Sequence, residues 1–456
     1  MDMRNNTPWK AKGLATILTV IALPFILIIA GLAIDSGRAY SMQAKLFAAV
    51  DAAGIAAARA VSGGELAASA AASKYFNVNI SPGLKSSNPQ ITNISYSYDT
   101  DGNISIDLTA SADMPTSFIR LLGYDTWGVG AKAQTVRRPV DIVLVVDNSS
   151  SLLGYGTSGG ANVSSQVIAQ SKAFLKNFNP SFDRVSVVKY ANGAEVPVPF
   201  LSSRGHTASA VESAINAFSF ISSSGGSNVY HYTNTSEGLY RALSQFSPTD
   251  PNAASLKVIV FFTDGTPTAF SADFNFDGTS TNGAIYATGS NGNGLWSTDK
   301  ISQKLSGYDE GSNIRNKISI LNGDQTEGGF GLFDGRRTVL PFSQGSSGSA
   351  LWDNIQQISR NLPEQMAQQA RSNDIYVFTL GLGSALTEQS GKTGWQERGE
   401  YLLYRMANDP AMQDNSDLAS DFDATQKQGV YCYAVDEDAL GPCFDKMLDV
   451  IVRLTL

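Results

Sequence analysis

The sequence predicts an α/β protein with three parts: an N-terminal transmembrane helix, a small region of helix and antiparallel sheet, and a doubly wound, Rossmann-like domain with a long insertion. An uncharged apolar run covers residues 13–34, alternating side chains flank a turn at 99–103, and β-branched runs alternate with helical patterns from residue 141 onward. We place the boundaries at 1–12 (cytoplasmic tail), 13–35 (transmembrane helix), 36–137 (helix and small β domain) and 138–456 (doubly wound domain).

The N-terminal apolar run is long enough to cross a membrane. Residues 13–34 carry no charge, and 22 residues at about 1.5 Å each span about 33 Å, against about 30 Å of hydrocarbon. Arg4, Lys10 and Lys12 precede the run, so the positive-inside rule predicts a single-pass protein with its N-terminus in the cytoplasm and its bulk outside. A cleaved signal peptide is the alternative, but the run is long for one and Asp35 opens no A-x-A cleavage site.

An Ala-rich helix is predicted directly after the span. Its apolar residues recur every three or four positions, at Ala39, Met42, Leu46, Val50, Ala53 and Ala57. This stripe either covers the helix's own domain or packs against a partner, because small side chains permit close helix packing. Residues 67–76 form a second predicted helix.

A small antiparallel sheet follows these helices. Residues 90–98 and 104–110 alternate between apolar and polar side chains on either side of a turn that contains Asp99 and Gly102, which predicts a β-hairpin. Residues 128–136 give a further strand.

The remainder of the chain alternates strands with helices, as a doubly wound sheet requires. Strands are predicted at 141–147, 184–190, 194–200, 257–263, 375–381 and 430–435. Helices are predicted near 164–178, 207–219, 235–247, 350–372, 397–408 and 437–455. Pro197 and Pro199 cannot donate to a sheet ladder, so the strand at 194–200 should be the edge strand.

Oxygen-bearing side chains follow two of these strands and one loop. Asp147, Ser149 and Ser151 form a D-x-S-x-S pattern directly after the first strand, and Asp264 follows the fourth. Thr233 lies in a loop that opens a helix. Because neighbouring parallel strands end at the same edge of a sheet, we expect these segments to converge. Carboxylate and hydroxyl oxygens suit a small hard cation.

A long insertion, about 266–348 and rich in Gly, Ser, Asn and Asp, interrupts the domain after Asp264. Since it leaves the sheet at the edge that carries the site, we expect it to cover the site or to form a partner surface. Within it, Asp273, Asn275 and Asp277 match the first half of a calcium loop, but Ala284 replaces the closing Glu and excludes a true EF-hand. A partial second Ca²⁺ site completed elsewhere and a plain Asp/Asn turn are the two alternatives.

Cys432 and Cys443 are the only cysteines, at the end of the last strand and the start of the last helix. In an oxidising compartment a disulfide here would stabilise the fold by about 3 kcal/mol on the chain-entropy relation. Two free buried thiols are the alternative. A zinc site is not expected, because neither His206 nor His231 has ligand spacing.

The charge and residue composition argue against two classes of function, nucleic-acid binding and catalysis. A net charge of −8 with a pI near 4.9 excludes nucleic acid as a partner, because no basic surface offsets phosphate repulsion. The chain has two histidines and no nucleophile–base pair, so it is predicted to be non-enzymatic.

The D-x-S-x-S pattern, the Thr233 loop and the Thr263-Asp264-Gly265 strand end together resemble the von Willebrand factor A domain and its metal-ion-dependent adhesion site. The resemblance implies that Ser149, Ser151 and Thr233 contact Mg²⁺ (or Mn²⁺ or Ca²⁺) directly, and that Asp147 and Asp264 act directly or through water. Thr235 is the alternative to Thr233. One coordination position is then open to an acidic group on a partner.

The N-terminal segments at 13–15, 31–40 and 51–60, with Pro24 in the span, resemble TadE-like and TadG-like proteins of the tight-adherence (Flp) pilus system. Because Gly13 is followed by no early Glu, prepilin-type processing is not expected. The resemblance implies other Tad components as partners and a bacterial inner-membrane protein with a periplasmic bulk.

Two functions fit these observations. The first is a membrane-anchored, metal-dependent protein-binding module in the assembly or anchoring of a Flp/Tad-type pilus, engaging a pilus or envelope protein through an acidic group. The second is a surface-exposed adhesin or minor pilin that binds a host or matrix ligand. Retention in the inner membrane distinguishes the first from the second.

Overall fold

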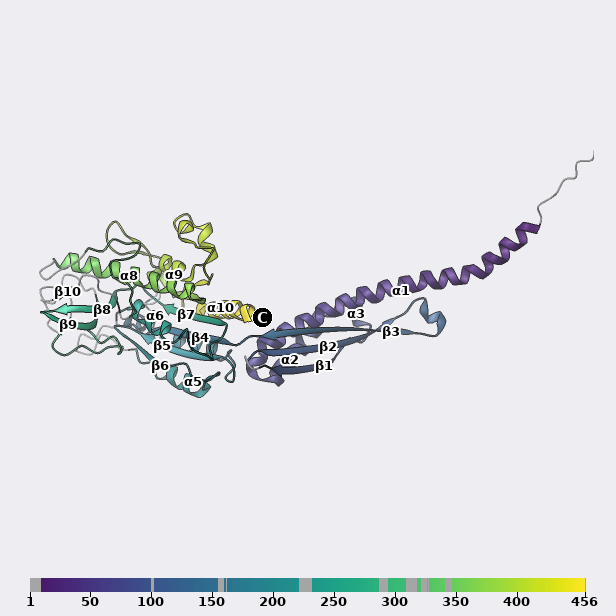
Figure 1. The fold of residues 1–456 in the computed structure, drawn as a ribbon, viewed down its shortest axis with the longest axis horizontal. Helices are drawn as coiled ribbons and strands as arrows, with labels where there is room; N and C mark the ends of the chain where they lie inside the picture. The colour runs from purple at the N-terminus through teal and green to yellow at the C-terminus, as the bar shows by residue number, and fades with distance from the viewer. Residues whose placement is uncertain are drawn as a thin grey trace, which may run out of the picture. The chain divides into compact units, whose positions relative to one another are not determined.

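The computed structural model describes residues 10–99, 102–154, 160, 162–220, 232–286, 294–308, 318–320, 326, 328–340 and 347–455. The chain forms two compact units that divide between Arg137 and Arg138, here called the N-terminal and the C-terminal unit (Figure 1). The fold is mixed α/β, with a long apolar helix at its start.

One long helix and a three-stranded sheet make up the N-terminal unit. Helix α1 runs from Lys10 to Ala60 with Pro24 inside it, so the predicted span and the predicted Ala-rich helix are one continuous helix. The other helices are α2 (Glu65–Asn79) and α3 (Pro82–Lys85). Strands β1 (Gln90–Tyr98), β2 (Ile104–Pro115) and β3 (Thr126–Arg137) pair antiparallel in that order, with a 3-10 turn, η2 (Ile119–Leu122), between β2 and β3.

The C-terminal half of α1 packs on this sheet. Leu46, Val50 and Ala53 are fully buried, as are the inward-facing Ile104 and Ile106 of β2. Burying each large aliphatic side chain contributes about 1.5–3 kcal/mol, so this face accounts for much of the unit's stability. Of the two alternatives for the stripe, the structure supports the one in which the helix covers its own domain.

A six-stranded sheet forms the centre of the C-terminal unit, in the order β14-β11-β7-β4-β5-β6. All neighbours are parallel except β6, an antiparallel edge strand as its prolines predict. The strands are β4 (Val140–Asp147), β5 (Arg184–Tyr190), β6 (Ala194–Val198), β7 (Leu256–Thr263), β11 (Ile375–Leu382) and β14 (Tyr431–Ala434).

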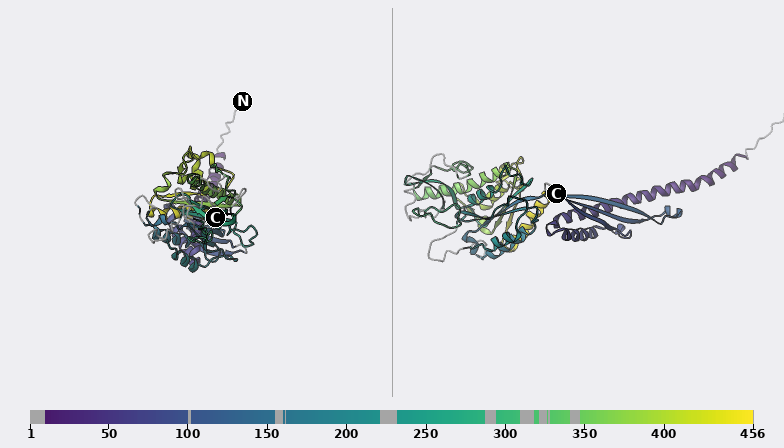
Figure 2. Two further views of the ribbon diagram at one scale, coloured as in Figure 1. Left: turned by 90° about the vertical axis from the view of Figure 1, so that its left-hand side faces the viewer. Right: turned by 60° about the horizontal axis from the view of Figure 1, so that its bottom comes forward.

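Helices cover both faces of this sheet, so the domain is doubly wound as predicted (Figures 1 and 2). One core contains Ile142 and Leu144 of β4 and the helices α4 (Ser164–Leu175), α5 (Ala208–Asn216) and α10 (Leu440–Thr455). The other contains Val143 and Val145 and the helices α6 (Thr235–Leu243), α8 (Gly348–Ser372) and α9 (Gly399–Ala407). Because β4 is buried on both faces, its residues 142–146 are all apolar.

The insertion contains regular structure that the sequence analysis did not predict. Strands β8 (Ala269–Phe276), β9 (Thr279–Tyr286) and β10 (Ile318–Ile320) form an antiparallel sheet in the order β10-β8-β9. Phe270 and Phe274 of β8 are fully buried in the same core as α6 and α8. This part of the insertion is therefore built into the domain. Two short strands, β12 (Gln389–Ser390) and β13 (Glu397–Arg398), lie further along the chain.

Cys432 of β14 and Cys443 of α10 form a disulfide, with their Cα atoms 5.6 Å apart. The predicted bridge is confirmed, and it ties the last helix to the edge of the sheet. The end of α10 also returns to the start of the unit, where the Arg138 N–H donates to the Thr455 carbonyl at 2.8 Å.

Candidate metal centre

The candidate site lies where β4 and β7 end, side by side in the sheet. Asp147 is the last residue of β4, and Asp264 directly follows the last residue of β7. After Asp147 the chain turns into a short 3-10 helix, η3 (Ser150–Leu153), which places Ser149 and Ser151 above the strand end. Strand pairing thus brings together residues more than a hundred positions apart.

A continuous set of hydrogen bonds joins these four residues. The Ser149 N–H donates to Asp147 Oδ1 at 2.8 Å, and the two serine Oγ atoms lie 2.9 Å apart. The Ser151 hydroxyl donates to Asp264 Oδ1 at 2.7 Å. The structure therefore places Asp147, Ser149, Ser151 and Asp264 in one polar cluster, and their role as metal ligands stays a prediction.

Thr233 lies on a loop fastened to the same edge. Its N–H donates to Thr268 Oγ1 at 3.1 Å, and its carbonyl accepts the Thr268 N–H at 3.0 Å, only four residues beyond Asp264. The next residue, Asn234, caps α6 through the Glu237 N–H and donates to Ser271. Among the described residues, no hydrogen bond joins the Thr233 hydroxyl to the cluster of Asp147, Ser149, Ser151 and Asp264.

Thr235 occupies a different position. It lies in the first turn of α6, almost fully buried, and its hydroxyl oxygen has no hydrogen-bond partner in the described structure. Both threonines are therefore close to the strand ends, and the choice between them as ligand stays open.

Asp147 is held by two residues that the sequence analysis did not predict. Its Oδ2 accepts from the Thr263 hydroxyl at 2.7 Å and from the Tyr190 hydroxyl at 3.3 Å. Both donors come from strands next to β4, at positions whose side chains point to this edge. The sequence gave only a weak signal that Thr263 and Tyr190 belong to the site. Both residue types are common in strands, so their positions at the strand ends do not set them apart.

The electrostatics of the cluster are those of two buried carboxylates without a counter-ion. Asp147 is 0% and Asp264 1% exposed, and among the described residues neither carboxylate forms an ion pair with Lys or Arg. Burial raises the pKa of Asp147, although the hydroxyls of Ser149 and Thr263 oppose the shift. Burial and the nearby Asp147 charge raise the pKa of Asp264 to about 8. Asp264 Oδ2 is buried without a hydrogen-bond partner in the described structure.

A hard divalent cation fits this donor set. Two carboxylates and at least two hydroxyls are the oxygen ligands that Mg²⁺ and Ca²⁺ prefer, and a bound cation would satisfy the unpartnered oxygen and oppose the carboxylate repulsion. Among the described residues, no group of three or more His, Cys, Asp or Glu side chains is arranged to hold a metal ion, so the candidate ligands here are two carboxylates and the neighbouring hydroxyls.

The second candidate cation site falls on the β8–β9 hairpin. Asp273 and Asn275 lie within β8, and Asp277 opens the turn to β9. Asp273 Oδ1 accepts from Asn282 at 3.0 Å, and Asn275 Oδ1 accepts the Gly278 N–H at 2.8 Å, as in a turn held by its own side chains. Asp277 (φ 49°) and Gly278 (φ 89°) both adopt the left-handed conformation of a type I′ turn. These contacts favour the plain-turn alternative.

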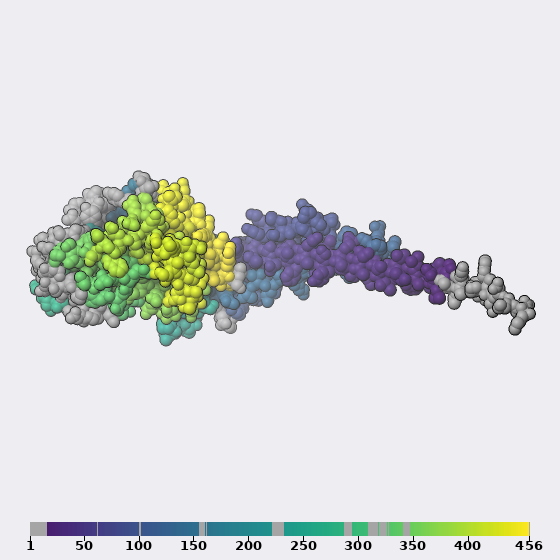
Figure 3. Space-filling view, turned by 90° about the horizontal axis from the view of Figure 1, so that it is seen from above, coloured from purple at the N-terminus to yellow at the C-terminus, as the bar shows by residue number. Residues whose placement is uncertain are grey.

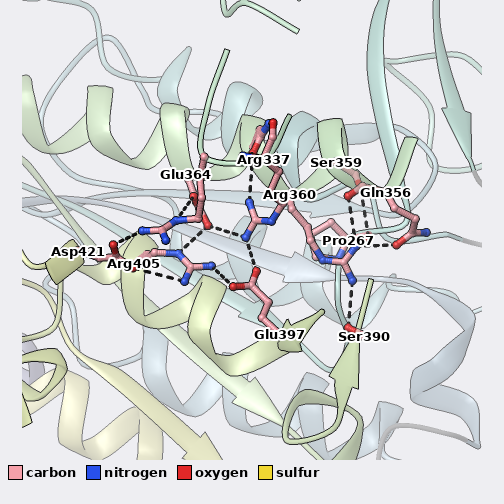
Figure 4. Close-up of polar contacts among 12 residues, drawn as sticks. Pro267, Arg337, Gln356, Ser359, Arg360, Glu364, Ser390, Glu397, Arg405 and Asp421 are labelled. Atoms are coloured by element: carbon pink, nitrogen blue, oxygen red, sulfur yellow. Dashed lines mark hydrogen bonds and ion pairs between the residues drawn. The ribbon is translucent and has the colours of Figure 1, made fainter. Parts of the chain in front are cut away.

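Helix α8 supports the chain that follows Asp264. The Ser359 hydroxyl donates to the Pro267 carbonyl at 3.2 Å, and Arg360 bonds Gln356 and Ser390 (Figure 4).

One turn along α8, a buried ion network attaches the insertion (Figure 4). Arg337 and Arg405 share the carboxylates of Glu364 and Glu397, with Arg405 Nη2 2.7 Å from Glu397 Oε2. Burial alone would raise the pKa of Glu397, but the two guanidinium groups lower it. Removing one partner from such a network costs about 3–5 kcal/mol because a buried charge is left unpaired. The sequence did not predict this network, because its four charged residues are spread along the chain and follow no recognisable spacing.

Comparison with protein families identifies two segments. Residues 13–60 match the putative Flp pilus-assembly TadE/G-like family, and residues 141–280 match the von Willebrand factor type A domain. The chain therefore carries a TadE/G-like segment and a von Willebrand A domain, and the resemblance to a TadG-like protein with that domain is confirmed. The second match ends within β9, inside the insertion. A comparison with curated proteins gave no match.

Solved structures to which this chain is similar include several pilus proteins. The pilus adhesin SpaC from Lactobacillus rhamnosus GG is 17% identical with a TM-score of 0.39; the alignment covers 81% of this chain and 35% of SpaC, so the chain spans about a third of that protein. The PilB minor pilin from Streptococcus sanguinis is 13% identical with a TM-score of 0.37, covering 81% of this chain and 79% of PilB. The vWF domain of the type V pili tip protein Mfa5 from Porphyromonas gingivalis is 17% identical with a TM-score of 0.35, covering 71% and 98%.

Proposed function

We propose that this chain, which joins a TadE/G-like segment to a von Willebrand A domain, is a membrane-anchored, metal-dependent protein-binding module that acts in the assembly or anchoring of a Flp/Tad-type pilus. The observation that carries the metal-dependent part is the pair of buried carboxylates, Asp147 and Asp264, with an unpartnered oxygen and no counter-ion among the described residues. An uncompensated pair of this kind is costly in a folded protein unless a cation binds it.

The proposed ligands are Asp147, Ser149, Ser151, Thr233 and Asp264, and the proposed ion is Mg²⁺, with Mn²⁺ or Ca²⁺ as substitutes. The cation would neutralise the two carboxylates and leave a position for an acidic group of a pilus or envelope protein. We assign no catalytic step to the chain.

Helix α1 supports the proposed anchor. Its apolar stretch has a mean hydropathy of 2.9 and is only 6% buried, so it is apolar on all sides and largely free of protein contacts. Figure 3 shows the purple part of this helix extending beyond the rest of the N-terminal unit. We place the protein in the bacterial inner membrane with its bulk in the periplasm, where the Cys432–Cys443 disulfide is stable.

The test is metal-dependent capture of other Tad components by the purified protein. We expect capture in Mg²⁺ and its loss in EDTA, in Asp264→Ala and, to a smaller degree, in Thr233→Ala. Asp445→Ala, at an exposed position on α10, is the matched control and should capture normally. Capture that is equal in Mg²⁺ and EDTA contradicts the proposal. Digestion by a protease added to intact cells would instead support the surface-exposed adhesin or minor pilin.

A further inference from the structure

The loop between β2 and β3 exposes a group of large apolar side chains. Phe118, Leu121, Leu122 and Tyr124 are 41%, 83%, 55% and 66% exposed. We call residues 116–125 the apolar loop. Four such residues on ten positions are costly to leave in water, since each large apolar side chain gains about 1.5–3 kcal/mol when it is removed from water.

This loop lies against the apolar stretch of α1 (Figures 1 and 2). A hollow of about 230 Å³ separates them, lined by Leu27, Ile28 and Leu32 of α1 and by Phe118, Leu121 and Leu122 of the loop. Gly31 permits the approach, because a Cβ added there would lie 2.4 Å from Phe118 Cβ. Leu27, Ile28 and Leu32 precede Asp35, which ends the apolar stretch. At about 1.5 Å per residue, they lie about 4–12 Å along the helix from Asp35, inside that stretch.

Three backbone N–H groups at the start of the loop are paired without water. The fully buried Asp35 carboxylate accepts the N–H groups of Ser117 at 3.0 Å, Phe118 at 2.8 Å and Ile119 at 2.9 Å. Arg38 pairs with the same carboxylate at 3.3 Å. Such internal bonding is what a backbone segment needs in order to leave water, because an unpaired peptide group in hydrocarbon costs several kcal/mol.

We propose that the apolar loop is a second membrane contact, which inserts Phe118, Leu121 and Leu122 into the outer leaflet beside α1. The ligand is a phospholipid bilayer, and Tyr124 lies at the headgroup level, where aromatic side chains with a polar tip are favoured. This rests on the proposed anchoring by α1. Asp35 acts as the positioning residue, because it holds the loop against the helix at the membrane surface.

Site-specific fluorescence tests the insertion in the full-length protein. Because the two native cysteines are joined, a single introduced cysteine can be labelled with an environment-sensitive dye without reductant. The labelled positions are Leu121→Cys in the loop, Leu23→Cys in α1 and Leu66→Cys on α2, where the side chain is 89% exposed. The protein is placed in vesicles of phosphatidylcholine and phosphatidylglycerol with or without lipids that carry a quencher on the acyl chain.

We expect the Leu121 label to show blue-shifted emission, to lose intensity with the lipid-borne quencher as the Leu23 label does, and to resist quenching by aqueous iodide. The Leu66 label should respond only to iodide. If Leu23 is quenched from the lipid but Leu121 behaves like Leu66, the loop does not insert and the anchor stands. Protection of Leu121 from both quenchers identifies a protein partner, including a second copy, and overturns the lipid assignment. If neither Leu23 nor Leu121 responds to the lipid quencher, anchoring by α1 fails as well.

Discussion

Replacing Asp264 by Asn should stabilise the metal-free C-terminal unit and abolish its response to Mg²⁺. Asp264 is buried beside Asp147, and these two effects raise its pKa to about 8. Asn removes one of the two charges but keeps an oxygen that can accept the Ser151 hydroxyl. The same change takes away half of the negative charge that a divalent cation requires.

The size of the effect follows from the change in proton affinity. The pKa of Asp264 lies well above its ordinary value of 3.8, and each tenfold change in proton affinity corresponds to about 1.4 kcal/mol. Near pH 8 the metal-free fold therefore carries a cost of a few kcal/mol that the variant lacks. In the Asp264→Asn variant the hydrogen bond from Ser151 is weaker, which reduces the gain in stability by about 1 kcal/mol. Mg²⁺ at a hundred times its dissociation constant should stabilise the wild type by about 2.7 kcal/mol and the variant by none.

Chemical denaturation of residues 138–456 at pH 8, with Mg²⁺ and with EDTA, measures both effects. This fragment contains both hydrophobic cores and the disulfide. Asp445→Asn, an exposed carboxylate on α10, is the control and should match the wild type in both buffers. A less stable Asp264→Asn in EDTA, or an equal gain from Mg²⁺ in both proteins, refutes the reasoning.

Three other measurements have expected outcomes. The raised pKa of Asp264 favours folding at low pH, so the metal-free fragment should lose this contribution to its stability as the pH rises through about 8. The affinity for Mg²⁺ should increase over the same range, because Asp264 must first release its proton, and a pH-independent affinity would contradict this. Alkylation without reductant should label neither Cys432 nor Cys443, and reduction should lower the stability by about 3 kcal/mol; labelling of both in fresh protein would disprove the bridge. A reporter fused after Ala60 should be active only as a periplasmic enzyme, and cytoplasmic activity would reverse the topology.

The central sheet was predictable because its strands are buried on both faces. Val140–Asp147 and Leu256–Thr263 are nearly unbroken runs of β-branched and aromatic residues, which helices rarely show, and their observed bounds differ from the predicted ones by one residue. Proline likewise identified the edge strand Ala194–Val198, where a missing donor does no harm.

The sheet within the insertion was missed for a chemical reason. Phe270, Ala272, Phe274 and Phe276 alternate with polar residues, and Asp277-Gly278 is a hairpin turn, so the strand signal is present. Asp273 and Asn275 on the strand and Asp277 in the turn also match half of a calcium loop, and that match obscured the alternation. The third strand of this sheet, β10, is only three residues long and has no signal of its own.

In the candidate site, sequence could predict the residues at strand ends and little else. Asp147 and Asp264 meet because parallel strands end at one edge. Tyr190, Thr263 and the support from Ser359 depend on how side chains pack around that edge, which no spacing in the sequence encodes.

Calorimetric titration of residues 138–456 with Mg²⁺ and Mn²⁺, wild type against Asp264→Ala, tests the metal site most directly. Two buried carboxylates and a buried, unpartnered oxygen predict that the wild type binds one ion at this site and that the variant, with one carboxylate left, binds far more weakly while its far-ultraviolet circular dichroism is unchanged. No heat of binding in the wild type, or equal binding by both proteins, would show that the Asp147–Ser151 segment is only a turn at the end of a sheet.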